Sequence, residues 1–360
     1  MANTRLSATI PASTATCTVS IINATCDLRP NAQVMVEPVI PGMEHLDFPT
    51  YSFHIKHNPS GRQFLFDMGA RKDWKNNVPQ LVQILEEAIG GLDVKKEVPT
   101  ILADSGVRVE EIEAMILSHW HFDHTGNLAR LSTATKLVVG PGFRDEFLPG
   151  YPANPKSFFW EEEFDGREVV EISFSGDLMI GQFQAHDYLG DGSLYILNVP
   201  GHATGHISAL VRTTPDTFVF LGGDVCHHAG VFRPTQYLPL PSEVPKGTAA
   251  LDKLTPFFRI PTATPVYSDP AQAQDSVESL QAFDADPNIL VVIAHDPTSA
   301  HVFDFFPNGT LSDWKQKGWK EKGHWGFLGT LPFQGKAQQA SLGTMKVDSI
   351  SWEQLHGRSS

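Results

Sequence analysis

Residues 118–124 read Ser-His-Trp-His-Phe-Asp-His and follow directly on a short apolar run that predicts a buried strand. His119 and His121 are two residues apart on the turn after this strand, so their imidazoles can point to one spot. Asp123 and His124 can point to a second spot beside it, and we expect this turn to contain no helix. Imidazole and carboxylate groups suit zinc or another divalent ion. The segment therefore predicts ligands for two metal ions.

Three later segments also place histidine or aspartate where an apolar strand ends. Residues 200–206 read Pro-Gly-His-Ala-Thr-Gly-His, and we favour His202, at the tight glycine turn, over His206 as a ligand. His206 then has a supporting, structural role. Asp224 follows Leu-Gly-Gly at a strand end, where a carboxylate could bridge two cations, and His295 follows the last apolar strand. Four such motifs in order predict a two-metal site.

The rest of the chain indicates many strands and few helices. Apolar residues share one helical face at 79–89, before Gly90-Gly91, and a second helix is indicated at 276–283. Strands are indicated at residues 16–25, 50–57, 63–66, 115–117, 136–139, 178–185, 193–199, 206–212, 217–221 and 289–294. We predict an α/β fold of two sheets covered by outer helices, with the helix at 79–89 packed on a sheet.

Three parts are expected along the chain. Residues 1–50 form an N-terminal strand extension, residues 51–305 the main domain and residues 306–360 a C-terminal extension. Residues 225–270 are rich in proline and aromatic residues and show little periodicity. This composition predicts a lid or pocket insertion within the main domain.

The charge and composition exclude several classes of partner. The 360 residues carry 27 Lys and Arg against 41 Asp and Glu, a formal net charge of −14 without a basic cluster, so we expect no nucleic-acid partner. No apolar run reaches the roughly 18–20 residues of a membrane span, and the first residues lack the pattern of a secretion signal. The three cysteines are too scattered for a disulfide framework. We expect a cytoplasmic protein without a membrane partner, with a homodimer as the working hypothesis.

Together these motifs resemble the metallo-β-lactamase superfamily over about residues 53–303. The resemblance implies an αββα sandwich of two mixed β-sheets that holds two zinc ions at its edge. It also implies which residues bind them. The first ion is expected on His119, His121 and His202, and the second on Asp123, His124 and His295, with Asp224 bridging both. Phe-Asp-Met-Gly at 66–69 resembles the early strand-end motif of the family, which makes Asp67 a support for a ligand histidine.

The branch of the family follows from the loop residues. A glutamate in place of His121 would suggest the oxygen-reducing diiron branch, so the histidine favours hydrolysis. Thr-Gly-Asn at 125–127 and Ala-His-Asp at 294–296 resemble the acyl-homoserine lactonases. In such a site two cations lower the pKa of a shared water, and the resulting hydroxide attacks a carbonyl. Asp123 is then the expected proton shuttle.

One departure from the lactonase pattern bears on the chemistry. Those enzymes commonly place a tyrosine three residues after the bridging aspartate, where this chain has His227. An imidazole there could donate to an oxyanion or protonate a leaving group, so we name His227 as a candidate catalytic residue. The alternative is that His227 lies outside the reacting shell.

The substrate is expected to be a small molecule in an apolar cleft. Its predicted lining is aromatic: Trp120, Phe122, Phe232 and Tyr237. The leading hypothesis is a zinc-dependent hydrolase that opens a small cyclic ester, cyclic amide or carbamate, with a role in detoxification of xenobiotics or secondary metabolites. The alternatives are an acyl thioesterase of the glyoxalase II or carrier-protein type and a noncatalytic metal-binding module.

Overall fold

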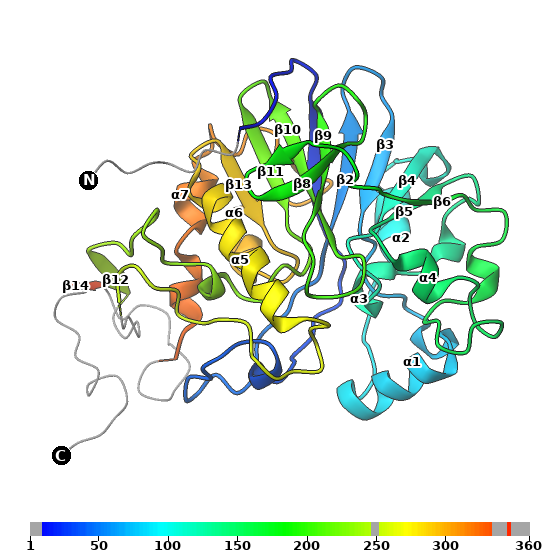
Figure 1. Cartoon of the computed structure of the whole chain (residues 1–360), viewed down its shortest axis with the longest axis horizontal. Helices are drawn as coiled ribbons and strands as arrows, with labels where there is room; N and C mark the ends of the chain where they lie inside the picture. Colours follow the sequence, from blue (N-terminus) through cyan, green and yellow to red (C-terminus); the bar gives the residue numbers. More distant parts are fainter. Residues whose placement is uncertain (1–8, 246–251, 333–343, 347–360) are drawn as a thin grey trace.

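The computed structural model describes residues 9–245, 252–332 and 344–346, and two six-stranded sheets dominate it (Figure 1). The first sheet runs in chain order, antiparallel from β1 to β3 and parallel from β3 to β6. Its strands are β1 (Cys17–Asn23), β2 (Tyr51–His57), β3 (Gln63–Phe66), β4 (Ile112–Ile116), β5 (Lys136–Val139) and β6 (Val169–Glu171). Both directions within one sheet give the mixed sheet that the resemblance implies.

The second sheet has the order β13-β11-β10-β9-β8-β7 and is antiparallel except for the parallel pair of β11 and β13. Its strands are β7 (Met179–Ile180), β8 (Phe183–Asp187), β9 (Leu194–Asn198), β10 (Ile207–Thr214), β11 (Thr217–Leu221) and β13 (Ile289–Val292). A small third sheet pairs β12 (Glu243–Pro245) with β14 (Thr344–Lys346).

The main core lies between the two large sheets, and strand alternation fills it. Val219 and Leu221 of β11 join Phe53 and Phe66 of the first sheet in this core. Phe220, between them in sequence, points to the opposite face, as the two-residue repeat of a strand requires. The layered α/β architecture expected from the sequence is confirmed.

Helices cover the outer faces of both sheets. The longest, α5 (Pro270–Ala285), packs Val277, Leu280 and Phe283 on the second sheet, and the first sheet is covered by α2 (Val98–Asp104) and α4 (Phe143–Phe147). The remaining helices are α1 (Pro79–Ile84) with a π-helical turn at Leu85–Ile89, α3 (Phe122–Thr125), α6 (Ser299–Val302) and α7 (Trp319–Gly323). Short 3-10 turns lie at Ala32–Val34, Trp74–Asn76, Val109–Glu111, Leu128–Arg130, Glu161–Glu163, Ala229–Val231 and Gly326–Thr330.

The helix at 79–89 forms as predicted, but its packing differs from the prediction. Leu81 and Leu85 lie in a small cluster with Val78. Phe122, from the histidine-rich segment at 118–124, and the half-buried Trp160 pack against this cluster. In Figure 1, α1 lies below the sheets rather than on one of their faces. Apolar periodicity specifies which side of a helix is buried but not what packs against it. Here side chains from loops and short helices, and not a sheet, pack on the apolar side of this helix.

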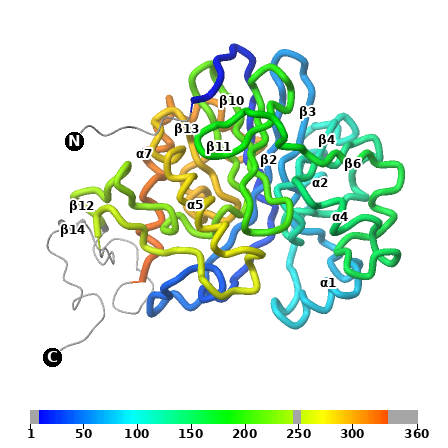
Figure 2. The backbone as a smooth tube through the Cα atoms, viewed as in Figure 1, coloured from blue at the N-terminus to red at the C-terminus, as the bar shows by residue number. Residues whose placement is uncertain are grey.

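Parts of both expected extensions join the main core. Strand β1 pairs with β2 along its whole length, and Leu311 and Trp314 are buried in the same cluster as Val19 and Ile21. Segments 24–50 and 252–269 lie side by side, where a β-bridge joins Glu37 to Arg259 (Figure 2). The domain boundaries stay a prediction, and residues 1–8, 246–251, 333–343 and 347–360 lie outside the described part of the chain.

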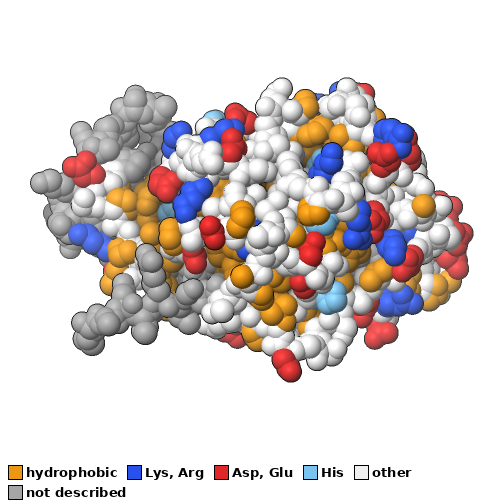
Figure 3. Space-filling model, turned by 90° about the horizontal axis from the view of Figure 1, so that it is seen from above, with side chains coloured by type: hydrophobic (Ala, Val, Ile, Leu, Met, Phe, Trp, Pro, Cys, Tyr) orange, Lys and Arg blue, Asp and Glu red, His pale blue; other side chains and the backbone are white. Residues whose placement is uncertain are grey.

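The described helices and the surface charge also bear on the expected partners. Among the described helices, none combines the length and apolar character needed to cross a membrane. Basic and acidic side chains are interspersed over the face shown in Figure 3.

Candidate metal centre

The segment at 117–121, which follows β4, leads directly into helix α3. His121 is the extended residue before α3, and its carbonyl accepts from the backbone N–H of His124 at 3.0 Å and of Thr125 at 3.3 Å. Asp123 and His124 therefore lie on one helical turn. The expectation that this turn contains no helix is wrong, because the spacing of the side chains says nothing about the backbone hydrogen bonds that close it.

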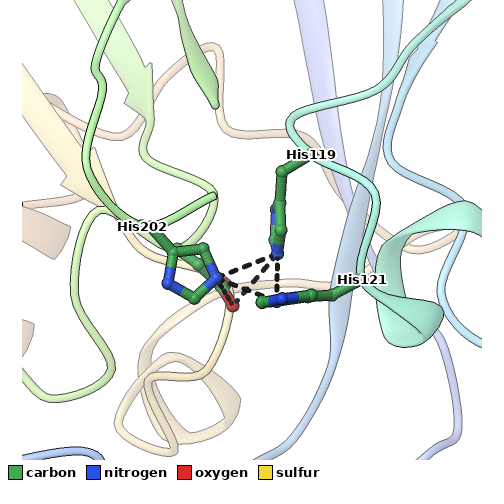
Figure 4. Close-up of side chains that lie close together, drawn as sticks. His119, His121 and His202 are labelled. Carbon is green, nitrogen blue, oxygen red and sulfur yellow. Dashed lines mark hydrogen bonds and ion pairs between the residues drawn. The ribbon is translucent and has the colours of Figure 1, made fainter. Parts of the chain in front are cut away.

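Three imidazoles converge at the first spot. Nε2 of His119 lies 2.9 Å from Nδ1 of His121 and 3.1 Å from Nε2 of His202, and the latter two nitrogens are 3.0 Å apart. Figure 4 shows that His119 and His121 approach from one loop and His202 from the loop opposite. Three nitrogen atoms this close cannot all direct lone pairs at one another without a proton or a cation between them.

A second group lies beside the first. Oδ2 of Asp123 is 3.5 Å from Nε2 of His295 and 3.9 Å from Nε2 of His124. Asp224 stands between the two groups: Oδ1 lies 3.2 Å from Nε2 of both His124 and His295, and Oδ2 faces the first group, 3.4 Å from Nε2 of His202. The seven side chains predicted as ligands are thus brought together in two groups with one carboxylate in common.

A chain of hydrogen bonds below the loop orients its histidines. Oδ2 of Asp67 accepts from Nδ1 of His124 at 2.8 Å and from the hydroxyl of Ser118 at 2.8 Å. The Ser118 oxygen lies 3.0 Å from Nδ1 of His119, so that N–H can donate to it. Asp67 itself has φ of +59°, an uncommon conformation that aspartate tolerates and that turns its carboxylate toward the loop. Such outer partners fix the ring orientation of metal-binding histidines.

The last histidine is held from the N-terminal part of the chain. Nδ1–H of His295 donates to the carbonyl of Pro49 at 2.9 Å. The ring of Phe48 stacks on His295, with centroids 4.6 Å apart and planes at 10°. No sequence signal pointed to Phe48 or Pro49, which lie almost 250 residues before the histidine.

His206 is close to both groups but has both nitrogens occupied. Nδ1–H donates to the carbonyl of Val199 at 2.7 Å, so Nε2 is the atom that accepts from the backbone N–H of Asp224 at 3.0 Å. Gly223 has φ of +53°, and a Cβ there would lie 3.0 Å from Nε2 of His206. His206 therefore fixes the backbone of Asp224, which is the supporting role that the sequence favoured over a ligand role.

Burial and charge set the protonation of the two groups. Burial, together with neighbouring imidazoles, lowers the pKa of His119 and His202 well below the ordinary histidine value, so their lone pairs are free near neutral pH. Burial alone would raise the pKa of Asp224, but the imidazoles of His124 and His295 outweigh it and hold that pKa well below its usual range. Asp224 is therefore ionised.

The orphaned atoms of the site fit a divalent metal ion. Within the described structure, neither Nε2 of His124 nor Oδ1 of Asp224 has a hydrogen-bond partner, although both atoms are fully buried. Leaving such groups unpaired is costly, and imidazole nitrogen and carboxylate oxygen are ordinary ligands of zinc. The donor set thus suits a dinuclear metal site.

His227 lies beneath Asp224 and has both ring nitrogens in hydrogen bonds. Its Nε2 is 3.1 Å from Oδ2 of Asp224, and its Nδ1 is 2.6 Å from the hydroxyl of Tyr267. Phe48 also stacks near this ring, with centroids 5.5 Å apart. The sequence pointed to His227 but not to the polar role of Tyr267, which follows only from the fold.

The four predicted pocket residues fall in different places. Trp120 stacks on Phe158 and meets the edge of His121, with centroids 4.6 Å apart in each pair, and half-buried Phe122 packs toward α1. Phe232 is fully buried in the core beneath the guanidinium of Arg233. Tyr237 lines an outer cavity of about 900 Å³ whose wall contains none of the seven candidate ligands. Trp120 and Phe122 remain candidate pocket residues, whereas Phe232 is accounted for by core packing.

Several known proteins are similar to this chain. Residues 86–222 match the model of the metallo-beta-lactamase superfamily. Gamma-lactamase FDB1 of Fusarium pseudograminearum is 40% identical over 94% of this chain and 88% of its own length. Metallo-hydrolase mfmC of Annulohypoxylon moriforme is 39% identical over 88% of each chain.

A solved structure gives the same fold. It is that of an N-acyl homoserine lactone hydrolase with N-hexanoyl-L-homoserine bound at its catalytic metal center. It aligns with 83% of this chain and all of its own, with a TM-score of 0.55 and 17% sequence identity. With two relatives of about 40% identity over most of their length, the chain is a hydrolase that belongs to the metallo-β-lactamase superfamily.

Proposed function

We propose that the chain is a dinuclear zinc hydrolase that opens a small cyclic amide or cyclic ester, with a γ-lactam as the favoured substrate. The observation that carries the proposal is the pair of donor groups that meet at Asp224. His119, His121 and His202 would hold one ion, and Asp123, His124 and His295 the other. Nitrogen and oxygen donors without a thiolate favour zinc over softer metals.

The choice of a ring amide rests on relatedness. The relative named gamma-lactamase is 40% identical to this chain over nearly its whole length. A ring ester remains close chemically, because both reactions break a carbonyl bond in a ring and differ only in the leaving atom. The least buried side of the centre is also aromatic: half-buried Trp120 adjoins His121, the one half-buried histidine among the candidate ligands, and this aromatic neighbour supports a flat substrate.

Zinc bound by these residues would polarise the ring carbonyl and activate water at neutral pH. Asp123 lies at the mouth of the second group, 3.5 Å from Nε2 of His295, and we assign it the proton that the leaving nitrogen or oxygen needs. His227 is enclosed by Asp224, Tyr267 and Phe48. We therefore assign it an action on Asp224 rather than on the substrate.

A panel of substrates tests this proposal with the zinc-loaded protein. We expect proton release with γ-lactams, and with lactones or cyclic carbamates at lower rates, but not with matched open-chain amides. Asp123→Asn should lower kcat about 100-fold or more, the range expected for loss of a proton-transfer group. Asp216→Asn, on the exposed turn between β10 and β11, is the matched control and should leave turnover unchanged.

Two results would overturn the proposal. Turnover of acyl thioesters alone would replace ring opening with a thioesterase. Full activity after a chelator has removed every bound metal would rule out the metal centre as the reactive site. A role in the detoxification of xenobiotic or secondary-metabolite lactams is part of the same proposal and requires turnover of such compounds.

A further inference from the structure

The loop before α5 contacts both sides of the candidate centre. The backbone N–H of Ser268 donates to the carbonyl of His202 at 2.8 Å, and that of Asp269 donates to the carbonyl of Gly201 at 2.9 Å. Gly201 has φ of +119°, and a Cβ there would lie 2.1 Å from the backbone nitrogen of Ala273 in α5. The turn that presents His202 is thus pressed against this loop and helix.

The same loop reaches Asp224 through two side chains. The hydroxyl of Tyr267 lies 2.6 Å from Nδ1 of His227, and Nε2 of His227 lies 3.1 Å from Oδ2 of Asp224. All three side chains are buried. The ring of Tyr267 also meets the edge of His202, with centroids 5.0 Å apart.

The chemistry of Tyr267, His227 and Asp224 indicates which atom donates in each of these two hydrogen bonds. A carboxylate that binds metal is deprotonated and can only accept, so the tautomer of His227 with hydrogen on Nε2 is the one that can donate to Asp224. In the neutral ring Nδ1 then has a free lone pair, and the Tyr267 hydroxyl is the donor that meets it.

We propose that Tyr267 is a positioning residue of the metal centre. Its O–H fixes the ring of His227 in the tautomer with hydrogen on Nε2, and that N–H holds Oδ2 of Asp224 toward the first donor group. The inference rests on the proposed dinuclear site but not on the identity of its substrate. Among the described residues, Nδ1 of His227 makes a hydrogen bond only to the Tyr267 hydroxyl, so removal of that hydroxyl frees this nitrogen.

The tautomer of His227 gives a readout independent of catalysis. In the full-length protein labelled with ¹⁵N-histidine and loaded with zinc, we expect the ring signals of His227, assigned by their loss in His227→Gln, to be those of the Nε2–H tautomer. In Tyr267→Phe these signals should move toward the average of both tautomers, and zinc affinity, measured by chelator competition, should fall about 10–100-fold. Tyr188→Phe, beside Phe64 at the far edge of the sandwich, is the matched control and should change neither value.

A double-mutant cycle separates this role from simple packing. In the His227→Gln background, Tyr267→Phe should cause no further loss of zinc affinity, because the hydroxyl acts through His227. An equal loss in both backgrounds would overturn the proposal, and so would unchanged His227 signals in Tyr267→Phe. Neither outcome depends on turnover. A wild-type protein that binds two zinc ions but opens no ring would refute the proposed substrate, and the NMR and zinc-affinity measurements would still test the role of Tyr267.

Discussion

In the described part of the chain, two buried clusters that combine carboxylate with imidazole are neutralised differently. One is the candidate metal centre around Asp224. The other, here called the Arg233 cluster, consists of Arg233, Asp284 and His324. Arg233 binds both carboxylate oxygens of Asp284, with Nε–Oδ2 at 2.9 Å and Nη2–Oδ1 at 2.6 Å, and donates to the carbonyl of His324 at 2.7 Å.

The difference lies in where the positive charge comes from. In the Arg233 cluster the cation is a side chain of the protein, and it satisfies both oxygens of Asp284. In the candidate metal centre the buried oxygen Oδ1 of Asp224 makes no hydrogen bond within the described structure, and the side chains nearest to it are the imidazoles of His124 and His295, with Nε2 of each at 3.2 Å. A buried carboxylate paired with an arginine keeps its cation within the chain, whereas one surrounded by imidazoles that lack hydrogen bonds to it is suited to a metal ion taken up from solvent.

The largest expected effect comes from removing the built-in cation. Arg233→Met leaves Asp284 buried without its partner, and we expect the free energy of unfolding to fall by about 3–5 kcal/mol. Urea denaturation with and without zinc measures this loss, which should be nearly the same in both conditions. The double variant Arg233→Met/Asp284→Leu should recover most of the stability, because no charge is then left unpaired. A loss that appears only with zinc would erase the distinction between the two clusters.

The second prediction concerns a residue that supports the metal centre. Asp67→Asn removes the carboxylate that orients His124, so zinc affinity should fall about 10–100-fold, while the stability of the metal-free protein changes much less. Chelator competition measures the affinity. Asp191→Asn is the matched control, since Asp191 also lies against a histidine, with 2.8 Å to Nε2 of His57, but at a distance from the metal centre. Equal losses in both variants would contradict the assignment.

The smallest expected effect is a change in pH dependence. Burial, with the charge of Arg233 beside it, lowers the pKa of His324 to about 3. Below its unfolded pKa near 6.5 this histidine binds a proton only in the unfolded chain, so its contribution to stability is present above pH 6.5 and is lost as the pH falls toward 3. Between pH 6.5 and 5, His324→Gln should reduce the slope of unfolding free energy against pH by up to about 1.4 kcal/mol per unit. The exposed His301→Gln should leave the slope as in the wild type; if both variants behave alike, His324 does not titrate in this way.

The convergence of the candidate ligands could be predicted from the sequence because each lies on a short motif directly after an apolar strand. Strand ends at one edge of a sandwich meet, so local patterns sufficed to place His119, His202 and Asp224 together. The support of Asp67 also came from such a motif. What could not be predicted are contacts between segments without a motif, such as the Arg233–Asp284 pair, the hydroxyl of Tyr267 on His227 and the location of α1. These depend on which surfaces meet in three dimensions, and periodicity carries no information about that.

The hydrogen bond from His295 to the carbonyl of Pro49 joins positions 246 residues apart. A growing chain on the ribosome presents His119, His121, Asp123 and His124 early, but it lacks His202, Asp224 and His295 until most of its length has been synthesised. The seven candidate ligands are therefore complete only when segments far apart in the chain have met, so an ion held by all of them would bind late in folding rather than start it.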